Sequence, residues 1–130
     1  MARRLTFLAV AAVAVACGDV TGPWRFGGIY HVVGLNAPAD TAFTGSLRLG
    51  PSGANSVRAV ATFAGSSEEW HGQGVVRGDT LTLSVAPTGI ADVGRGFTGT
   101  LTQSDITGTW VAEGFTPYPP PSGTFTAHRS

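Results

Sequence analysis

Apolar and polar residues alternate with a period of two along most of the chain from Trp24 onward. This period is typical of β-strands, because successive side chains point to opposite faces of a sheet. Eight segments follow the pattern, and no window in this region supports an amphipathic helix. The residues predicted to face inward are Trp24, Phe26, Tyr30 and Val32; Phe43, Leu47 and Leu49; Val57, Ala59, Ala61 and Phe63; Trp70 and Val76; Leu81, Leu83 and Val85; Phe97 and Leu101; Ile106 and Trp110; and Phe125 and Ala127.

The links between these segments have the composition of tight turns. Arg77-Gly78-Asp79 and Gln103-Ser104-Asp105 predict hairpins, and Pro51–Asn55 predicts a longer link. Eight strands with short links predict an all-β, antiparallel up-and-down barrel, because closure removes exposed sheet edges. A two-sheet β-sandwich is the alternative. Closure requires the last strand, about Ser122–His128, to pair with the first, about Trp24–Leu35. Glycines at inward positions would permit the necessary curvature: Gly28, Gly45, Gly72, Gly74, Gly99 and Gly108.

Two short motifs resemble those of calycin barrels. Gly22-Pro23-Trp24 is similar to the Gly-x-Trp that opens the first strand of lipocalins, and Gly108-Thr109-Trp110 resembles an avidin strand. Calycin barrels often carry an arginine near the last strand that packs over the first-strand tryptophan. By this resemblance, Arg129 is expected to close the barrel by packing on Trp24. The motifs cover few residues, so the resemblance is to a class of barrel.

The first seventeen residues have the features of an export signal. Arg3 and Arg4 precede an apolar run from Leu5 to Ala16, which is too short to span a bilayer of roughly 30 Å. Ala14-Val15-Ala16-Cys17 resembles the lipobox of bacterial lipoproteins, in which the cysteine is lipidated and becomes the new N-terminus. The expected organisation is a signal peptide over 1–16, a lipidated tether over 17–23 and a barrel over 24–130. An ordinary signal peptide is the alternative.

The predicted location is the cell envelope. By the same resemblance, Gly18 after the cysteine favours the outer membrane, where the lipid anchor on Cys17 would hold the domain facing the periplasm or the surface. Removal of residues 1–16 leaves six arginines and eight acidic residues, a net charge of −2. With no basic stripe, nucleic-acid binding is disfavoured. Because Cys17 is the only cysteine, no internal disulfide is expected.

No catalytic, cofactor or metal site is predicted. His31, His71 and His128 alternate out of phase with the apolar positions, so they are expected to face solvent. Adjacent Glu68 and Glu69 are interpreted as a solvated turn, since paired catalytic carboxylates flank a substrate from separate positions. The Arg77-Gly78-Asp79 tripeptide is interpreted as a turn rather than an adhesion motif. The proline-rich segment 117–121 is interpreted as a stiff loop.

Two functions stay open at this point. The favoured one is a non-catalytic structural or interaction role on an envelope partner, because the inward aromatic residues have enough bulk to fill a small barrel and almost no polar group is expected inside. The alternative is a lipocalin-like binder or carrier of a small apolar ligand. The predicted ligand or rim contacts are then Trp70, Trp110 and Tyr118.

Overall fold

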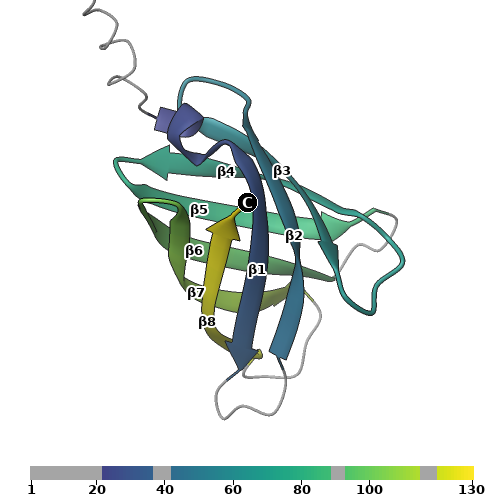
Figure 1. Ribbon diagram of the computed structural model, residues 1–130. Helices are drawn as coiled ribbons and strands as arrows, with labels where there is room; N and C mark the ends of the chain where they lie inside the picture. Colours follow the sequence, from purple (N-terminus) through teal and green to yellow (C-terminus); the bar gives the residue numbers. More distant parts are fainter. Residues whose placement is uncertain (1–21, 37–41, 89–92, 115–119) are drawn as a thin grey trace, which may run out of the picture.

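The computed structural model describes residues 22–36, 42–88, 93–114 and 120–130, which form a closed barrel of eight strands (Figure 1). A 3-10 helix, η2, precedes the first strand. The elements are η2 (Gly22–Phe26), β1 (Gly28–Asn36), β2 (Ala42–Pro51), β3 (Ser56–Phe63), β4 (Trp70–Arg77), β5 (Thr80–Pro87), β6 (Val93–Thr102), β7 (Asp105–Gly114) and β8 (Ser122–Arg129).

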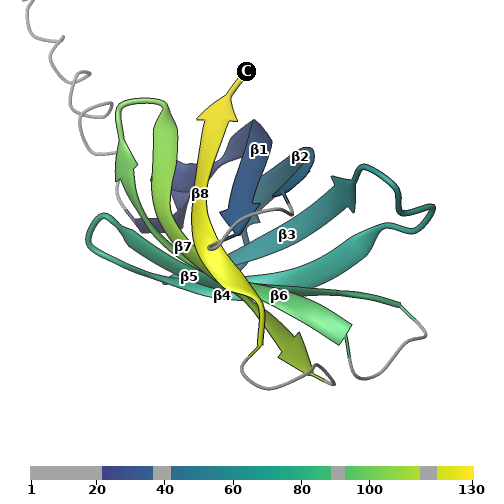
Figure 2. The same cartoon turned by 90° about the horizontal axis from the view of Figure 1, so that it is seen from below.

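Each strand is antiparallel to the next, and β8 closes the sheet against β1. Their register runs from Tyr30 opposite Arg129 to Asn36 opposite Gly123. Figures 1 and 2 show β8 lying between β1 and β7. The predicted up-and-down barrel is therefore confirmed. The sandwich alternative is wrong, because all eight strands belong to one closed sheet.

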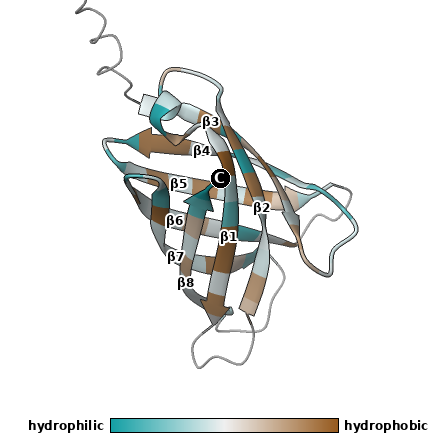
Figure 3. Cartoon of the chain, viewed as in Figure 1, coloured by the Kyte–Doolittle hydropathy of each residue, from teal (hydrophilic) through white to brown (hydrophobic). Residues whose placement is uncertain are grey.

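Apart from Trp24, the residues that the alternation predicted lie in the interior or pack against it. The buried apolar positions of β1 to β8 are all no more than 8% exposed, and hydropathy alternates along the strands in Figure 3. Phe43, near the start of β2, is only half-buried but packs against this core. The barrel is thus held by one continuous apolar interior, as period-two patterning requires.

Two inward glycines lie very close to the backbone of the neighbouring strand. A Cβ atom added at Gly72 would lie 1.7 Å from the carbonyl oxygen of Ser84, and one added at Gly108 would lie 1.9 Å from that of Thr98. Backbones this close leave no room for a side chain. The predicted role of the inward glycines in curvature stays a prediction.

The start of the barrel differs from the prediction. The first strand begins at Gly28 rather than Trp24, and residues 22–26 form η2 instead. Trp24 is 69% exposed, whereas Phe26 is fully buried and forms part of the apolar core. The Gly27-Gly28 pair separates helix from strand, since Gly28 has a φ of 139°, which an L side chain rarely adopts. The alternation through Trp24 and Phe26 therefore does not continue a strand.

The two ends of the barrel are built differently. At the closed end, η2 lies with the short links at 52–55, 78–79 and 103–104, where the predicted turns occur. The opposite end, called the loop end below, is where β1, β3, β5 and β7 finish (Figure 1). Residues 1–21, which include the predicted signal peptide and Cys17, lie outside the described residues. Within the described ranges, no helix is long and apolar enough to cross a membrane.

Candidate functional site

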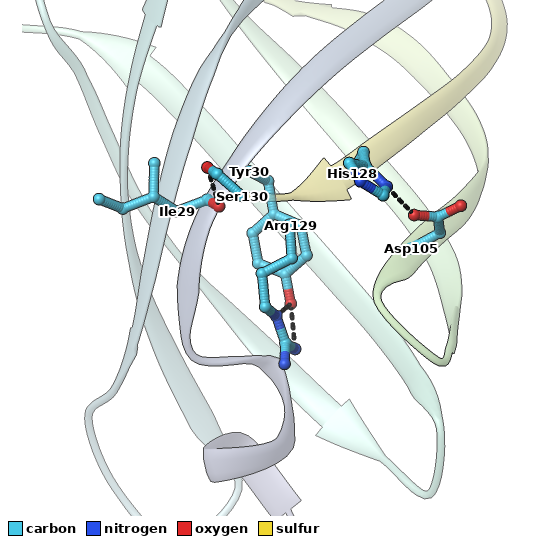
Figure 4. Close-up of polar contacts among 6 residues, drawn as sticks. All are labelled: Ile29, Tyr30, Asp105, His128, Arg129 and Ser130. Carbon is cyan, nitrogen blue, oxygen red and sulfur yellow. Dashed lines mark hydrogen bonds and ion pairs between the residues drawn. The ribbon is translucent and has the colours of Figure 1, made fainter.

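Arg129 seals the closed end by contacting Tyr30 (Figure 4). Its Cζ lies 5.2 Å from the centre of the Tyr30 ring, and its Nη2 donates to the Tyr30 hydroxyl at 2.6 Å. The same Nη2 donates to the carbonyl oxygen of Arg25 at 2.6 Å, and the Tyr30 hydroxyl donates to that of Phe26 at 3.0 Å. Arg129 was predicted to pack on Trp24; its contacts in the structure are with Tyr30 and Arg25. Trp24 points to solvent because η2 buries Phe26 instead.

The C-terminus is fastened at the same place. The backbone N–H and the hydroxyl of Ser130 both donate to the carbonyl oxygen of Ile29, at 2.9 and 3.1 Å. His128 of β8 contacts the carboxylate of Asp105 on the neighbouring strand, β7 (Figure 4). The polar groups described here have partners, which is the pattern of a structural seal.

At the loop end, aromatic rings from several strands meet edge to face. Phe43 of β2 is the centre of this group, with ring centroids 5.4 Å from Phe63, 6.1 Å from Phe97 and 5.0 Å from Trp110. Trp70 of β4 packs on Phe63 at 4.9 Å. Interplanar angles of 78° to 86° are those that aromatic quadrupoles favour. We refer to these five residues as the aromatic cluster.

Two cross-strand glycines give the cluster its shape. Phe43 lies opposite Gly34, and Phe63 lies opposite Gly45. A Cβ atom at Gly34 would lie 2.2 Å from the Phe43 ring, and one at Gly45 would lie 2.8 Å from the Phe63 ring. The absence of these side chains lets each ring lie flat over the neighbouring strand, which places it in the barrel mouth.

The two indoles are fixed by their N–H groups. Nε1 of Trp110 donates to the carbonyl oxygen of Leu35 at 2.8 Å, and Nε1 of Trp70 donates to the Ser66 hydroxyl at 3.2 Å. Because these donors are already used, both indoles offer only their apolar faces to a third group. Both side chains are less than 10% exposed.

Arg95 of β6 extends into the aromatic cluster. Its Cζ lies 4.1 Å from the ring centre of Phe43, 4.4 Å from that of Phe63, 5.1 Å from that of Trp70 and 5.9 Å from that of Trp110. The side chain is half-buried, and burial lowers the pKa of its guanidinium. Its Nη1 is shielded from solvent and has no hydrogen-bond partner among the described residues.

The sequence reasoning found part of this site. Trp70 and Trp110, two of the predicted contacts, do lie around one group at the loop end, while Tyr118 lies outside the described residues. Arg95 was missed, and the expectation of almost no inward polar group overlooked it. The sequence did contain a signal that Arg95 faces inward. Arg95 is two residues before buried Phe97, and side chains two residues apart share a face of a strand.

The other candidate residues lie apart from the cluster. His31, His71 and His128 are exposed, as predicted, and the described residues hold no group of three potential metal ligands. Asp79 of the Arg77-Gly78-Asp79 turn forms an ion pair with Arg25 of η2.

The interpretation of Glu68 and Glu69 as a solvated turn is half right. Glu69 is exposed, but Oε1 of Glu68 is shielded from solvent and has no hydrogen-bond partner within the described part of the chain. Glu68 lies in the link between β3 and β4, and its backbone N–H and carbonyl oxygen contact the hydroxyl of Ser66, which also holds Trp70.

The fold defines the class: a closed, eight-stranded antiparallel up-and-down barrel. It is similar to a solved structure described as EF1p2_mFAP2b bound to DFHBI, with a TM-score of 0.66 and 15% identity over 81% of this chain and 94% of that one. It is also similar to a redesigned β-barrel, mFAP1, bound to DFHBI, with a TM-score of 0.62 and 16% identity over 80% and 94%. No family model and no curated protein matches the sequence.

Proposed function

We propose that the chain is a non-catalytic binder of a small, largely apolar molecule, held by the aromatic cluster at the loop end. One observation carries the proposal: Arg95 stands among four rings with a shielded Nη1 that lacks a partner. Buried polar groups are satisfied almost everywhere in native proteins, so an unsatisfied one at a mouth indicates a missing partner.

The contrast with a solidly filled barrel supports this choice. A filler needs apolar side chains, and a buried unpaired charge in that place would only cost stability. Ligand sites combine apolar walls with a few placed polar groups, as the aromatic cluster and Arg95 do. The two barrels of similar fold are each described as bound to the small molecule DFHBI, which adds support for binding over a structural role.

The test uses N-phenyl-1-naphthylamine, a neutral aromatic fluorophore, titrated into the barrel domain. Bound probe should accept energy from Trp70 and Trp110, giving a saturable rise in its emission. Phe43→Ala removes the ring nearest to the Arg95 guanidinium and should weaken binding about fivefold, the worth of one aromatic contact. Trp24→Phe, at the closed end, is the matched control and should bind as the parent does.

Absence of any saturable response, with the probe and with a panel of fatty acids, retinoids and flat aromatic acids, would overturn the binding proposal. The filled-barrel role on an envelope partner would then be the better account. Equal weakening by Phe43→Ala and Trp24→Phe would place the probe outside the aromatic cluster and would also count against this site.

The localisation of the protein is a separate proposal that depends on the sequence alone. We propose that Cys17 carries lipid and tethers the barrel to the outer membrane, because Ala14-Val15-Ala16-Cys17 resembles a lipobox. Cells expressing the full chain should incorporate labelled palmitate into the protein. Cys17→Ala should abolish the label and move the protein to the soluble fraction, whereas an unlabelled parent protein would end this proposal.

A further inference from the structure

The chemistry around Arg95 narrows the class of ligand. A guanidinium has five N–H donors and no acceptor, and it stays charged at any ordinary pH. The faces of Phe43 and Phe63 stabilise the cation but accept no strong hydrogen bond. The shielded Nη1 can therefore donate a hydrogen bond, but it has no acceptor among the described residues.

The described acidic groups near the loop end are engaged elsewhere or enclosed. Glu113 projects from β7 toward the outer face, where its Oε2 accepts from the Ser84 hydroxyl at 3.2 Å. Glu69 contacts His71 at 3.3 Å. Oε1 of Glu68 is shielded from solvent and has no hydrogen-bond partner among the described residues, and none of the three carboxylates forms an ion pair with Arg95. The positive charge in the aromatic cluster is therefore not neutralised by them.

An oxyanion with two acceptor oxygens fits this arrangement best. A carboxylate or sulfonate accepts two N–H groups from one guanidinium, which is the strongest and most directional pairing that arginine makes. The aromatic cluster offers faces rather than polar edges, because the N–H groups of Trp70 and Trp110 are already used. Those faces suit a flat or apolar body attached to the anion.

We propose that the ligand of this barrel is an amphipathic organic anion, with its acidic group on Arg95 and its apolar body against the aromatic cluster. This inference rests on the proposed small-molecule function and adds the charge of the ligand to it. In this assignment Arg95 is the specificity-determining residue, and the rings supply affinity that is independent of charge.

The test compares two probes that differ by one anionic group. 8-Anilinonaphthalene-1-sulfonate is N-phenyl-1-naphthylamine with an added sulfonate, so the ratio of their dissociation constants isolates the anion. Arg95→Met removes the charge and keeps an apolar chain in the mouth. It should weaken binding of the sulfonate roughly 10-fold to 100-fold, the worth of a hydrogen-bonded charge pair, and leave the neutral probe within about threefold.

Two variants make the result specific. Arg48→Met removes the same charge from an exposed position on β2 and should leave both affinities unchanged. Arg95→Lys keeps the charge without the planar fork and should give an intermediate sulfonate affinity. Circular dichroism spectra and melting transitions like those of the parent would show that each variant is folded. If Arg95→Met does not fold, Arg95→Lys still allows the two probe affinities to be compared with those of the parent.

The outcomes separate the two proposals. If neither probe binds saturably, the small-molecule function fails. If both bind and Arg95→Met or Arg95→Lys leaves their ratio unchanged, the function stands and the anionic class is wrong. If Arg48→Met lowers sulfonate affinity as much as Arg95→Met does, the effect is overall charge, and the assignment to Arg95 is also wrong.

Discussion

Both ends of the barrel hold an arginine against aromatic rings, and the two arginines have opposite surroundings. At the closed end, Arg129 stacks on Tyr30 and donates to its hydroxyl and to the backbone carbonyl of Arg25. At the loop end, Arg95 lies among rings with Nη1 unsatisfied within the described residues. The same chemical group therefore has a full set of partners in one place and lacks one in the other.

The difference suggests a criterion for separating structural from ligand-binding residues in a small β-barrel: whether a buried donor has its acceptors. A buried donor with its full set of acceptors adds about 0.5–1.5 kcal/mol per hydrogen bond, more when it is charged. A shielded donor without an acceptor costs stability until a partner arrives. Replacing Arg129 should therefore destabilise the fold, whereas replacing Arg95 should mainly change what the barrel binds.

The largest effect is expected from breaking the seal entirely. Deletion of Ser122–Ser130 removes β8, which pairs with both β1 and β7, together with the buried side chain of Phe125 and the contact of Arg129. Phe125 alone is worth roughly 1.5–3 kcal/mol of burial, and a domain has only about 5–15 kcal/mol in total. The truncated chain should be unfolded or aggregated by circular dichroism and gel filtration.

A single-residue control belongs with this deletion. Ser130→Ala removes only the hydroxyl that donates to Ile29 and should leave a folded monomer. A truncated chain that stays monomeric with an unchanged melting temperature would contradict closure through β8.

The next effect concerns Arg129 alone. Arg129→Met keeps apolar bulk over Tyr30 but removes the donors to the Tyr30 hydroxyl and the Arg25 carbonyl, so unfolding free energy should fall by about 2–3 kcal/mol. Chemical denaturation would measure the loss, and probe affinity at the loop end should not change. A variant of parental stability with altered ligand affinity would reverse the roles assigned to the two ends.

The sequence predicted most of the fold because a barrel repeats one local rule. Period two placed nearly every core residue, and Gly78 and Ser104 marked turns that occur where they were expected. The rule failed at Trp24, where alternation continued by chance across a helix–strand boundary. The Gly27-Gly28 pair was the local sign of that boundary.

The contacts at the two ends were less predictable, because they join residues that the register of the strands brings together from distant parts of the chain. Trp70 and Trp110 were found as large inward residues, but nothing local pairs Arg129 with Tyr30, 99 positions away in the chain. Arg95 was hidden for a different reason. A hydrophobic pattern treats a charged residue as outward, so an inward arginine is visible only when its parity with Phe97 is followed.

Arg95→Met should have a smaller effect on stability than Arg129→Met. Loss of contact with the rings costs about 0.5–2 kcal/mol, and relief of the unpaired donor returns about 1–3 kcal/mol, so the variant should lose no more than about 1 kcal/mol of stability. Thermal and chemical denaturation of the ligand-free protein would measure it. Destabilisation by more than about 3 kcal/mol, the loss expected for a broken buried network, would show that Arg95 is a structural filler.

The smallest effect is expected at Trp24, the residue that the calycin resemblance placed in the core. Its side chain is 69% exposed, so Trp24→Ala should change unfolding free energy by less than about 0.5 kcal/mol. Phe26→Ala is the matched comparison two residues away, because Phe26 is fully buried and its removal should cost about 3–5 kcal/mol. Denaturation midpoints of the two variants give the comparison, and the tryptophan emission of Trp24→Ala should shift to shorter wavelength as the exposed indole is lost. If Trp24→Ala proves the more damaging of the two, Trp24 packs beneath the barrel as in the lipocalin pattern. The closed end would then depend on the packing of Arg129 over Trp24, and the contrast between Arg129 and Arg95 would need a different explanation.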